Sequence, residues 1–168
     1  VRHIWGAIKE LSYEITKREK EMEIALQAFM IKGGYPELLD KNDYSACSAE
    51  LKDTILSKSI LDIVERYSLR NIQVLRYLLA TIALHSGGKL SHAGISSDLG
   101  VERPTVISDL EYLEDAFLIS KSSFYSKSLA AGVRKEKKYY ISDAGMRNSI
   151  AGMMNENLLK DQTELGFV

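Results

Sequence analysis

The residues of this 168-residue chain that could carry catalytic chemistry do not fall into the patterns of known sites. The sequence contains no G-x-x-x-x-G-K-[ST] or G-x-G-x-x-G loop for phosphates, no H-E-x-x-H or C-x-x-C metal motif and no G-x-S-x-G nucleophile turn. His3, His85, His92 and Cys47 share no metal-ligand spacing, so we expect no metal site. These absences predict that the chain is not an enzyme.

A cluster of cations near the C-terminal end carries more physical content. Within it, Glu136-Lys137-Lys138 resembles the E-x-K half of a nuclease site, but no Pro-Asp partner lies upstream, and a solvated charge run explains it better. Glu136 is the one acidic residue among these cations. The cluster could neutralise DNA phosphates and release counterions. Its members are Lys121, Lys127, Arg134, Lys135, Lys137 and Lys138.

The elements around this basic segment have the order of a winged helix-turn-helix. A helix is expected to begin after Asn71 and to stop at Gly87-Gly88. Ser91 is a good N-cap for a second helix, which Gly100 ends by supplying a positive φ. Pro104 lies in the first turn of a third helix, where its missing N–H costs nothing.

The third helix should bury one face, and a hairpin should follow it. Apolar residues recur at helical spacing and are expected in the core, namely Val106, Leu110, Leu113 and Phe117. β-forming residues at Ile119 and at 139–141 flank the basic segment, and Lys89-Leu90 is expected to add a short strand. The sequence therefore predicts a winged helix over residues 70–142.

The third helix is the one that would enter a DNA groove, and its charge opposes that use. Asp109, Glu111, Glu114 and Asp115 outnumber Arg103. The sequence therefore predicts a DNA-binding accessory module that binds double-stranded DNA with weak sequence specificity. A winged helix used for protein–protein or interdomain contacts is the alternative, and a stand-alone enzyme is a remote third. The predicted DNA contacts are Arg103, Thr105, Ser108, Lys127, Arg134, Lys135, Lys137 and Lys138.

The rest of the chain is predicted to be helical. Two stripes, from Ile4 to Ile15 and from Met22 to Met30, stop at Gly33-Gly34, and a helix or helix pair runs from Leu51 to Tyr67. We expect a helical lid-like domain at 1–69, and at 143–168 a short helix followed by the start of a missing downstream domain. The predicted fold class is mainly α: a helical bundle followed by a winged helix with a small β-hairpin.

Composition narrows the setting. The net charge is −1 and the pI is about 6.4, which speaks against a globally basic nucleic-acid binder. The longest apolar run, 77–84, is far below the roughly 20 residues that span a bilayer, so no membrane partner is expected. The single Cys47 and the lack of a signal pattern favour a cytoplasmic location. A start at Val1 and an apolar end at 165–168 suggest a fragment of a longer protein.

Five short motifs in order carry a family resemblance. They are Gly33-Gly34-Tyr35-Pro36-Glu37, the run from Asp62 to Tyr67 leading to Arg70-Asn71, Tyr112-Leu113-Glu114, Tyr125-Ser126-Lys127-Ser128, and the run from Lys138 to Arg147. Together they resemble the C-terminal half of archaeal and bacterial AAA+-type ATPases that carry a winged helix and end in an uncharacterised nuclease-like domain. The resemblance covers nearly the whole chain.

The resemblance implies a role for the glycine-rich turn. Gly34, Tyr35 and Pro36 would contact the nucleotide, and a plain interhelical turn is the alternative. ATP and Mg would be cofactors of the full-length protein, whereas this chain would hold none, because the phosphate loop would precede Val1 and the nuclease-like domain would follow Val168. The implied partners are that missing ATPase core and nuclease-like domain, and the implied function is that of a non-catalytic lid and winged-helix fragment.

Overall fold

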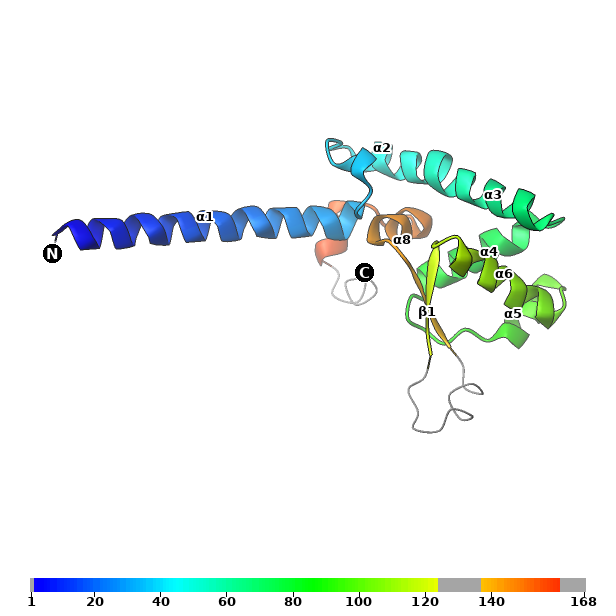
Figure 1. The fold of residues 1–168 in the computed structure, drawn as a ribbon. Helices are drawn as coiled ribbons and strands as arrows, with labels where there is room; N and C mark the ends of the chain where they lie inside the picture. The colour runs from blue at the N-terminus through cyan, green and yellow to red at the C-terminus, as the bar shows by residue number, and fades with distance from the viewer. Residues whose placement is uncertain (1, 124–136, 161–168) are drawn as a thin grey trace.

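The computed structural model describes residues 2–123 and 137–160, which are mainly helical with one small antiparallel sheet (Figure 1). In chain order the elements are α1 (Arg2–Lys32), the 3-10 turn η1 (Pro36–Leu38), α2 (Tyr44–Ala49), the π-helical segment η2 (Glu50–Leu56), α3 (Ser57–Tyr67), α4 (Ile72–Leu84), α5 (His92–Leu99), α6 (Arg103–Asp115), β1 (Ile119–Ser122), β2 (Lys138–Ile141), α8 (Ala144–Ala151) and η3 (Glu156–Lys160).

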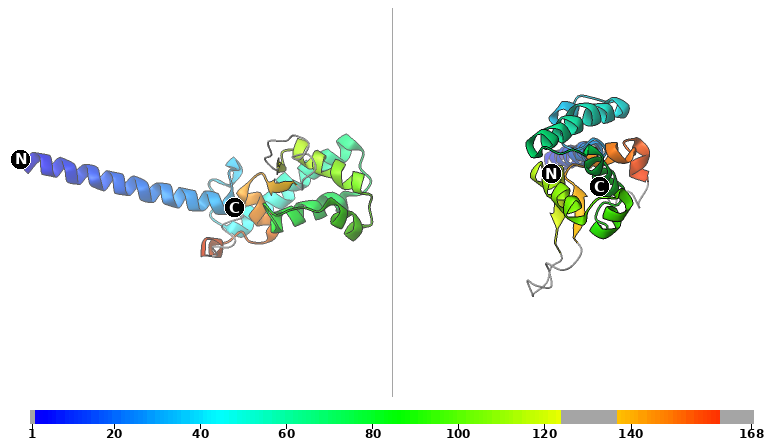
Figure 2. Two further views of the ribbon diagram at one scale, coloured as in Figure 1. Left: turned by 90° about the horizontal axis from the view of Figure 1, so that it is seen from below. Right: turned by 90° about the vertical axis from the view of Figure 1, so that its right-hand side faces the viewer.

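The two predicted N-terminal stripes lie on one continuous helix, α1, which is 31 residues long. No Gly or Pro interrupts the chain between the stripes, so the helix runs on until Gly33 adopts a φ of +79°. Most of α1 projects away from the other elements, and its C-terminal end packs against α8, α2 and η3 (Figures 1 and 2).

A second helical rod runs from Tyr44 to Tyr67 through α2, η2 and α3, as the sequence predicted for its later part. Asp43 begins the rod by accepting a hydrogen bond from the backbone N–H of Ser45. Ser68 ends it in the left-handed conformation, with a φ of 51°, while the N–H of Leu69 donates to the carbonyl of Val64.

The predicted caps Asn71, Ser91 and Gly100 of the next two helices, α4 and α5, are confirmed. The side chain of Asn71 accepts from the N–H of Gln73, and that of Ser91 accepts from the N–H of Gly94. Gly100 ends α5 with a φ of +63°, and a proline occupies the first turn of α6. These helices meet in the larger core, which includes Leu75, Leu78, Ile82, Val106, Leu113 and Ile119.

The sheet is a hairpin of β1 and β2. Ile119 lies opposite Ile141, and Ser122 lies opposite Lys138. Lys89 forms an isolated antiparallel bridge with Lys138, where the short third strand was expected. The predicted order of helix, helix, helix and hairpin is therefore present in the described residues.

Two predictions about α6 were wrong. Phe117 was expected in the core but is 85% exposed, because α6 ends at Asp115 and Phe117 takes the left-handed conformation, with a φ of 57°. The N–H of Leu118 then bonds the carbonyl of Leu113, which turns Leu118 inward in place of Phe117. Asp109 was expected on the acidic outer face, but its side chain is buried beside Val106 and Leu113.

Candidate functional site

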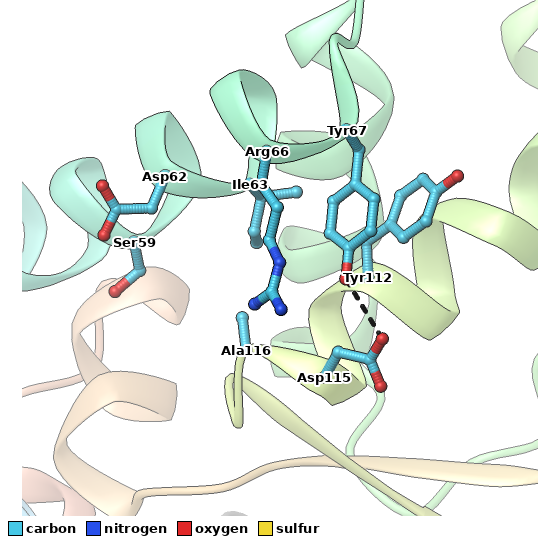
Figure 3. A pocket seen from close by; sticks show the side chains of 8 residues that line it. All are labelled: Ser59, Asp62, Ile63, Arg66, Tyr67, Tyr112, Asp115 and Ala116. Carbon is cyan, nitrogen blue, oxygen red and sulfur yellow. Dashed lines mark hydrogen bonds between the residues drawn. The ribbon is translucent and has the colours of Figure 1, made fainter.

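A pocket of about 210 Å³ lies between α3 and α6, and we call it the α3–α6 pocket (Figure 3). Helix α3 supplies one wall from the motif that begins at Asp62, and the C-terminal half of α6 supplies the other. The lining residues are Ser59, Asp62, Ile63, Arg66, Tyr67, Tyr112, Asp115 and Ala116.

A stacked tyrosine pair joins the two walls. The rings of Tyr67 and Tyr112 have centroids 3.8 Å apart and planes inclined by 18°. The hydroxyl of Tyr67 donates to the carboxylate of Asp115 at 3.2 Å (Figure 3). Burial and the Asp115 carboxylate raise the pKa of Tyr67, so the phenol stays neutral and keeps its proton for this bond. The pair fixes the end of α3 against α6.

Arg66 gives the pocket a cation. Its guanidinium carbon lies 5.7 Å from the centroid of the Tyr67 ring, within the range of a cation–π contact, and it extends along the pocket toward Ala116 (Figure 3). Asp62 and Asp115 place carboxylates at the edges. Such an open, mixed-charge pocket can receive a polar side chain of a partner, because a guanidinium binds carboxylates and the tyrosine faces bind planar groups.

The Gly33-Gly34-Tyr35-Pro36 turn lies at a second place, where α1 meets α8. The N–H of Gly34 donates to Asp143 Oδ2 at 2.8 Å, and Asp143 Oδ1 accepts from the N–H of Met146 at the start of α8, also at 2.8 Å. A Cβ atom on Gly33 would lie 2.2 Å from Asp143 Oδ1. Gly33 is thus required both by the approach of Asp143 and by its own positive φ.

The three residues predicted to contact nucleotide differ in burial and in hydrogen bonding. The N–H of Gly34 is already used by Asp143, Tyr35 is half-buried between the two cores, and Pro36 is exposed at the start of η1. Burial raises the pKa of Tyr35, and the charges of Asp143 and Glu37 add to the shift. Nucleotide contact by these residues stays a prediction.

Helix α8 satisfies the unpaired carbonyls at the ends of two other helices. Asn148 Nδ2 donates to the carbonyls of Met30 and Ile31 in the last turn of α1, at 2.9 and 3.1 Å. Arg147 Nε donates to the carbonyl of Ala83 in the last turn of α4 at 3.0 Å. The last four carbonyls of a helix have no partner within it, so side-chain donors are the expected remedy.

We call the contacts of α8 with α1, α2 and α4 the α8 junction, which also includes close packing and a further polar contact. Ser149 Oγ donates to the carbonyl of Ser48 in α2 at 3.0 Å. A Cβ on Gly145 would lie 1.8 Å from the carbonyl oxygen of Lys32, so α1 and α8 touch backbone to backbone. The roles of Arg147, Asn148 and Ser149 could not be predicted from the sequence. Three consecutive polar residues give no apolar period, and the motif ending at Arg147 was the one available signal.

The predicted DNA contacts are only partly brought together. Arg103 and Thr105 are exposed and Ser108 is partly exposed, all in the N-terminal half of α6. Lys138, the first residue of β2, is exposed, and Lys137, just before the strand, is half-buried. Lys127, Arg134 and Lys135 lie outside the described residues. The neighbouring Lys121 is paired with Glu114, which reduces the cation available on β1.

The described ranges contain no group of three His, Cys, Asp or Glu side chains that could hold a metal ion. In the same part of the chain, no helix is both long and apolar enough to cross a membrane.

Comparisons with known proteins identify the family. A family model described as a domain of unknown function, DUF8612, matches residues 23–157, and the chain belongs to this family. An uncharacterised protein of Haemophilus influenzae is 27% identical over 146 residues, which cover 81% of this chain and 35% of that protein. Uncharacterised protein MJ1544 of Methanocaldococcus jannaschii is 27% identical over 170 residues, covering 90% of this chain and 37% of that protein. The chain thus spans little more than a third of the length of these relatives, and no solved structure matches it.

Proposed function

We propose that this chain is a non-catalytic module of an AAA+-type ATPase, with a lid-like helical part and a winged helix that makes protein–protein or interdomain contacts. The order of α4, α5, α6 and the hairpin, with the bridge from Lys89 to Lys138, supports the winged helix. The five motifs support the ATPase family. Most of the length of the relatives lies outside the matched region and leaves room for a nucleotide-binding core.

The contact between α3 and α6 carries the preference for a protein partner. Thr105, Ser108, Tyr112 and Asp115 are spaced by three, four and three residues, so they form one stripe along α6. Tyr112 and Asp115 are already engaged by Tyr67 of α3. The C-terminal half of the stripe is therefore closed to a DNA groove, which a recognition helix must enter.

Charge favours the same conclusion. The exposed residues of α6 and of its N-cap position include Glu102, Glu111 and Asp115, and Arg103 is the one basic residue among the exposed ones. These carboxylates would repel phosphates, whereas a protein surface can present cations to them. The open N-terminal end of the stripe, around Thr105 and Ser108, is then the part of α6 that a protein or neighbouring domain would meet.

A titration of labelled random-sequence duplex DNA at low salt tests the proposal by fluorescence anisotropy. We expect no binding up to about 10⁻⁴ M protein, the weak end of ordinary non-specific affinity. Salt-dependent binding that Arg103→Ala weakens, while the exposed control Lys52→Ala leaves it unchanged, would overturn the proposal. In full-length MJ1544, amides matching 103–108 should exchange hydrogen more slowly when ATP is added, because the proposed core contacts them.

Weak, sequence-independent DNA binding is the second candidate. The exposure of Arg103, Thr105 and Lys138 favours it, because these side chains could reach phosphates without the groove being entered. Replacing Lys135, Lys137 and Lys138 together by alanine would then lower affinity about equally for all duplex sequences and flatten the salt dependence.

A further inference from the structure

Helix α1 presents a long apolar surface to solvent. Every residue from Lys9 to Gln27 is exposed, and the views in Figures 1 and 2 agree that most of α1 extends away from the other elements. Among the described side chains of α1, seven large apolar ones are more than half exposed, and five of these share one face: Leu11, Ile15, Met22, Leu26 and Phe29. We call these five residues the α1 stripe.

The spacing of the α1 stripe places its members on one face. Ile15, Met22 and Phe29 are seven residues apart, which is one heptad position repeated over three heptads. Leu11 lies four residues before Ile15, and Leu26 lies four after Met22, so both join the same face. The stripe covers about 27 Å of helix at 1.5 Å per residue, a length suited to pairing with a second helix.

Charges are sorted around the stripe. Four glutamates border it on its two sides: Glu14 and Glu21 on one, Glu19 and Glu23 on the other. Lys9, Lys17 and Lys20 lie on the opposite side of α1 by the same helical geometry, and Arg18 is the described cation at the edge of the stripe. An apolar seam with acidic borders specifies the charge of whatever covers it, because flanking charges set partner choice in helix pairs.

We propose that the α1 stripe binds an amphipathic partner helix whose own apolar face is flanked by Lys and Arg. This surface is separate from the α6 contact proposed above, so it would be a second binding site on the chain, selective for a basic helix. A second copy of this chain is a poor occupant, because Glu14 would face Glu19 in a parallel pair and glutamates would face glutamates in an antiparallel one. Anionic lipid and nucleic acid are disfavoured by the same borders.

Two synthetic 28-residue peptides test the proposal against the full chain. Both carry the same Leu and Ile heptads, one with Lys and the other with Glu at the flanking positions, so like charges keep each from pairing with itself. An exposed ion pair changes affinity by roughly twofold, so the four glutamates predict tighter binding of the Lys peptide by on the order of tenfold. The preference should shrink as salt is added.

Variants of α1 distinguish binding at the α1 stripe from non-specific hydrophobic binding. Ile15→Ser with Met22→Ser should abolish binding, while Tyr13→Ser with Ile24→Ser, on the opposite face and equally exposed, should leave it unchanged. Glu14→Lys, Glu19→Lys and Glu21→Lys together should reverse the preference toward the Glu peptide. Circular dichroism checks that each variant keeps its helix content.

Several outcomes would overturn the proposal. One is equal affinity for the two peptides, and another is no binding of either peptide at protein concentrations up to about 10⁻⁴ M. A third is equal loss of binding in the opposite-face variant. A dimer in analytical ultracentrifugation that Met22→Ser dissociates would assign the stripe to a second copy instead.

Discussion

Asp109 buries a carboxylate in an apolar core, where its negative charge is unfavourable, so replacing it with a neutral residue should stabilise the protein. The residue is 4% exposed on the core face of α6, and burial raises the pKa of its carboxyl from 3.8 to about 6. At pH 7 the group is therefore charged in a place that disfavours charge. The difference between a pKa of 3.8 and one of about 6 corresponds to roughly 3 kcal/mol, which is the upper limit of the destabilisation by Asp109 at neutral pH.

The sign of the pH dependence follows from proton linkage. Between about pH 4 and pH 6 the folded state holds the Asp109 proton more tightly than the unfolded chain does, so this group makes the free energy of unfolding fall as pH rises. Below pH 4 both states are protonated and the penalty vanishes. Asp109→Asn keeps the shape without the charge. It should raise the free energy of unfolding by up to about 3 kcal/mol at pH 7 and by almost nothing at pH 4.

Urea unfolding followed by circular dichroism, repeated from pH 4 to pH 7.5, measures this difference. Glu111→Gln is the matched control, because it removes a negative charge from the exposed side of the same helix. The control should change stability by less than about 0.5 kcal/mol at every pH. A variant at Asp109 that is no more stable than the parent at pH 7, or whose gain does not vary with pH, would refute the burial of this carboxylate.

Three further predictions concern the α8 junction and catalysis. Gly145→Ala should lower the free energy of unfolding by roughly 2–3 kcal/mol in urea melts, because the new Cβ would lie 1.8 Å from the backbone of Lys32. The control Gly94→Ala, whose Cβ would make ordinary contacts, should be near neutral. Similar effects of the two substitutions would contradict the close approach of α1 and α8. Asp143→Ala should lower the free energy of unfolding by about 2–4 kcal/mol, because it removes both the cap of α8 and the acceptor of the Gly34 N–H. Asp143→Asn should lower it less. A loss below about 0.5 kcal/mol in the alanine variant would contradict both hydrogen bonds. The purified chain should release no phosphate from ATP, since no phosphate loop occurs in its sequence, and turnover that survives further purification would contradict this.

Local signals in the sequence were sufficient for the start of α4 and for both ends of α5, whereas α4 ends at Leu84, before the predicted stop at Gly87-Gly88. Asn71, Ser91 and Gly100 each act within a few residues of their own position, so their side chains or φ values decide a boundary whatever the tertiary packing is. The same local logic failed at Phe117. Apolar periodicity continued past Asp115, but the left-handed turn that ends α6 changed which residue faced the core.

Contacts between distant residues could not be predicted. The bond from Gly34 to Asp143 joins residues 109 apart, and each end had a sufficient local explanation as a turn or a helix cap. The α3–α6 pocket likewise depends on how two helices pack. Tyr67 and Tyr112 each occurred in a motif that signalled family, but neither spacing nor polarity indicated that their rings stack.

Hydrogen bonds in the α8 junction hold the C-terminal end of α1 in its orientation. Arg147 and Asn148 are neighbours on α8, yet one bonds the last turn of α4 and the other bonds the last turn of α1, and the two side chains also bond each other at 3.1 Å. A rotation of α1 that broke the Asn148 bonds would leave buried polar groups unpaired, at a cost of about 1–3 kcal/mol for each group. Small displacements of α1 should therefore carry α8 and the end of α4 with them. A partner helix on the α1 stripe would then be connected, through α8 and α4, to the core against which α6 packs.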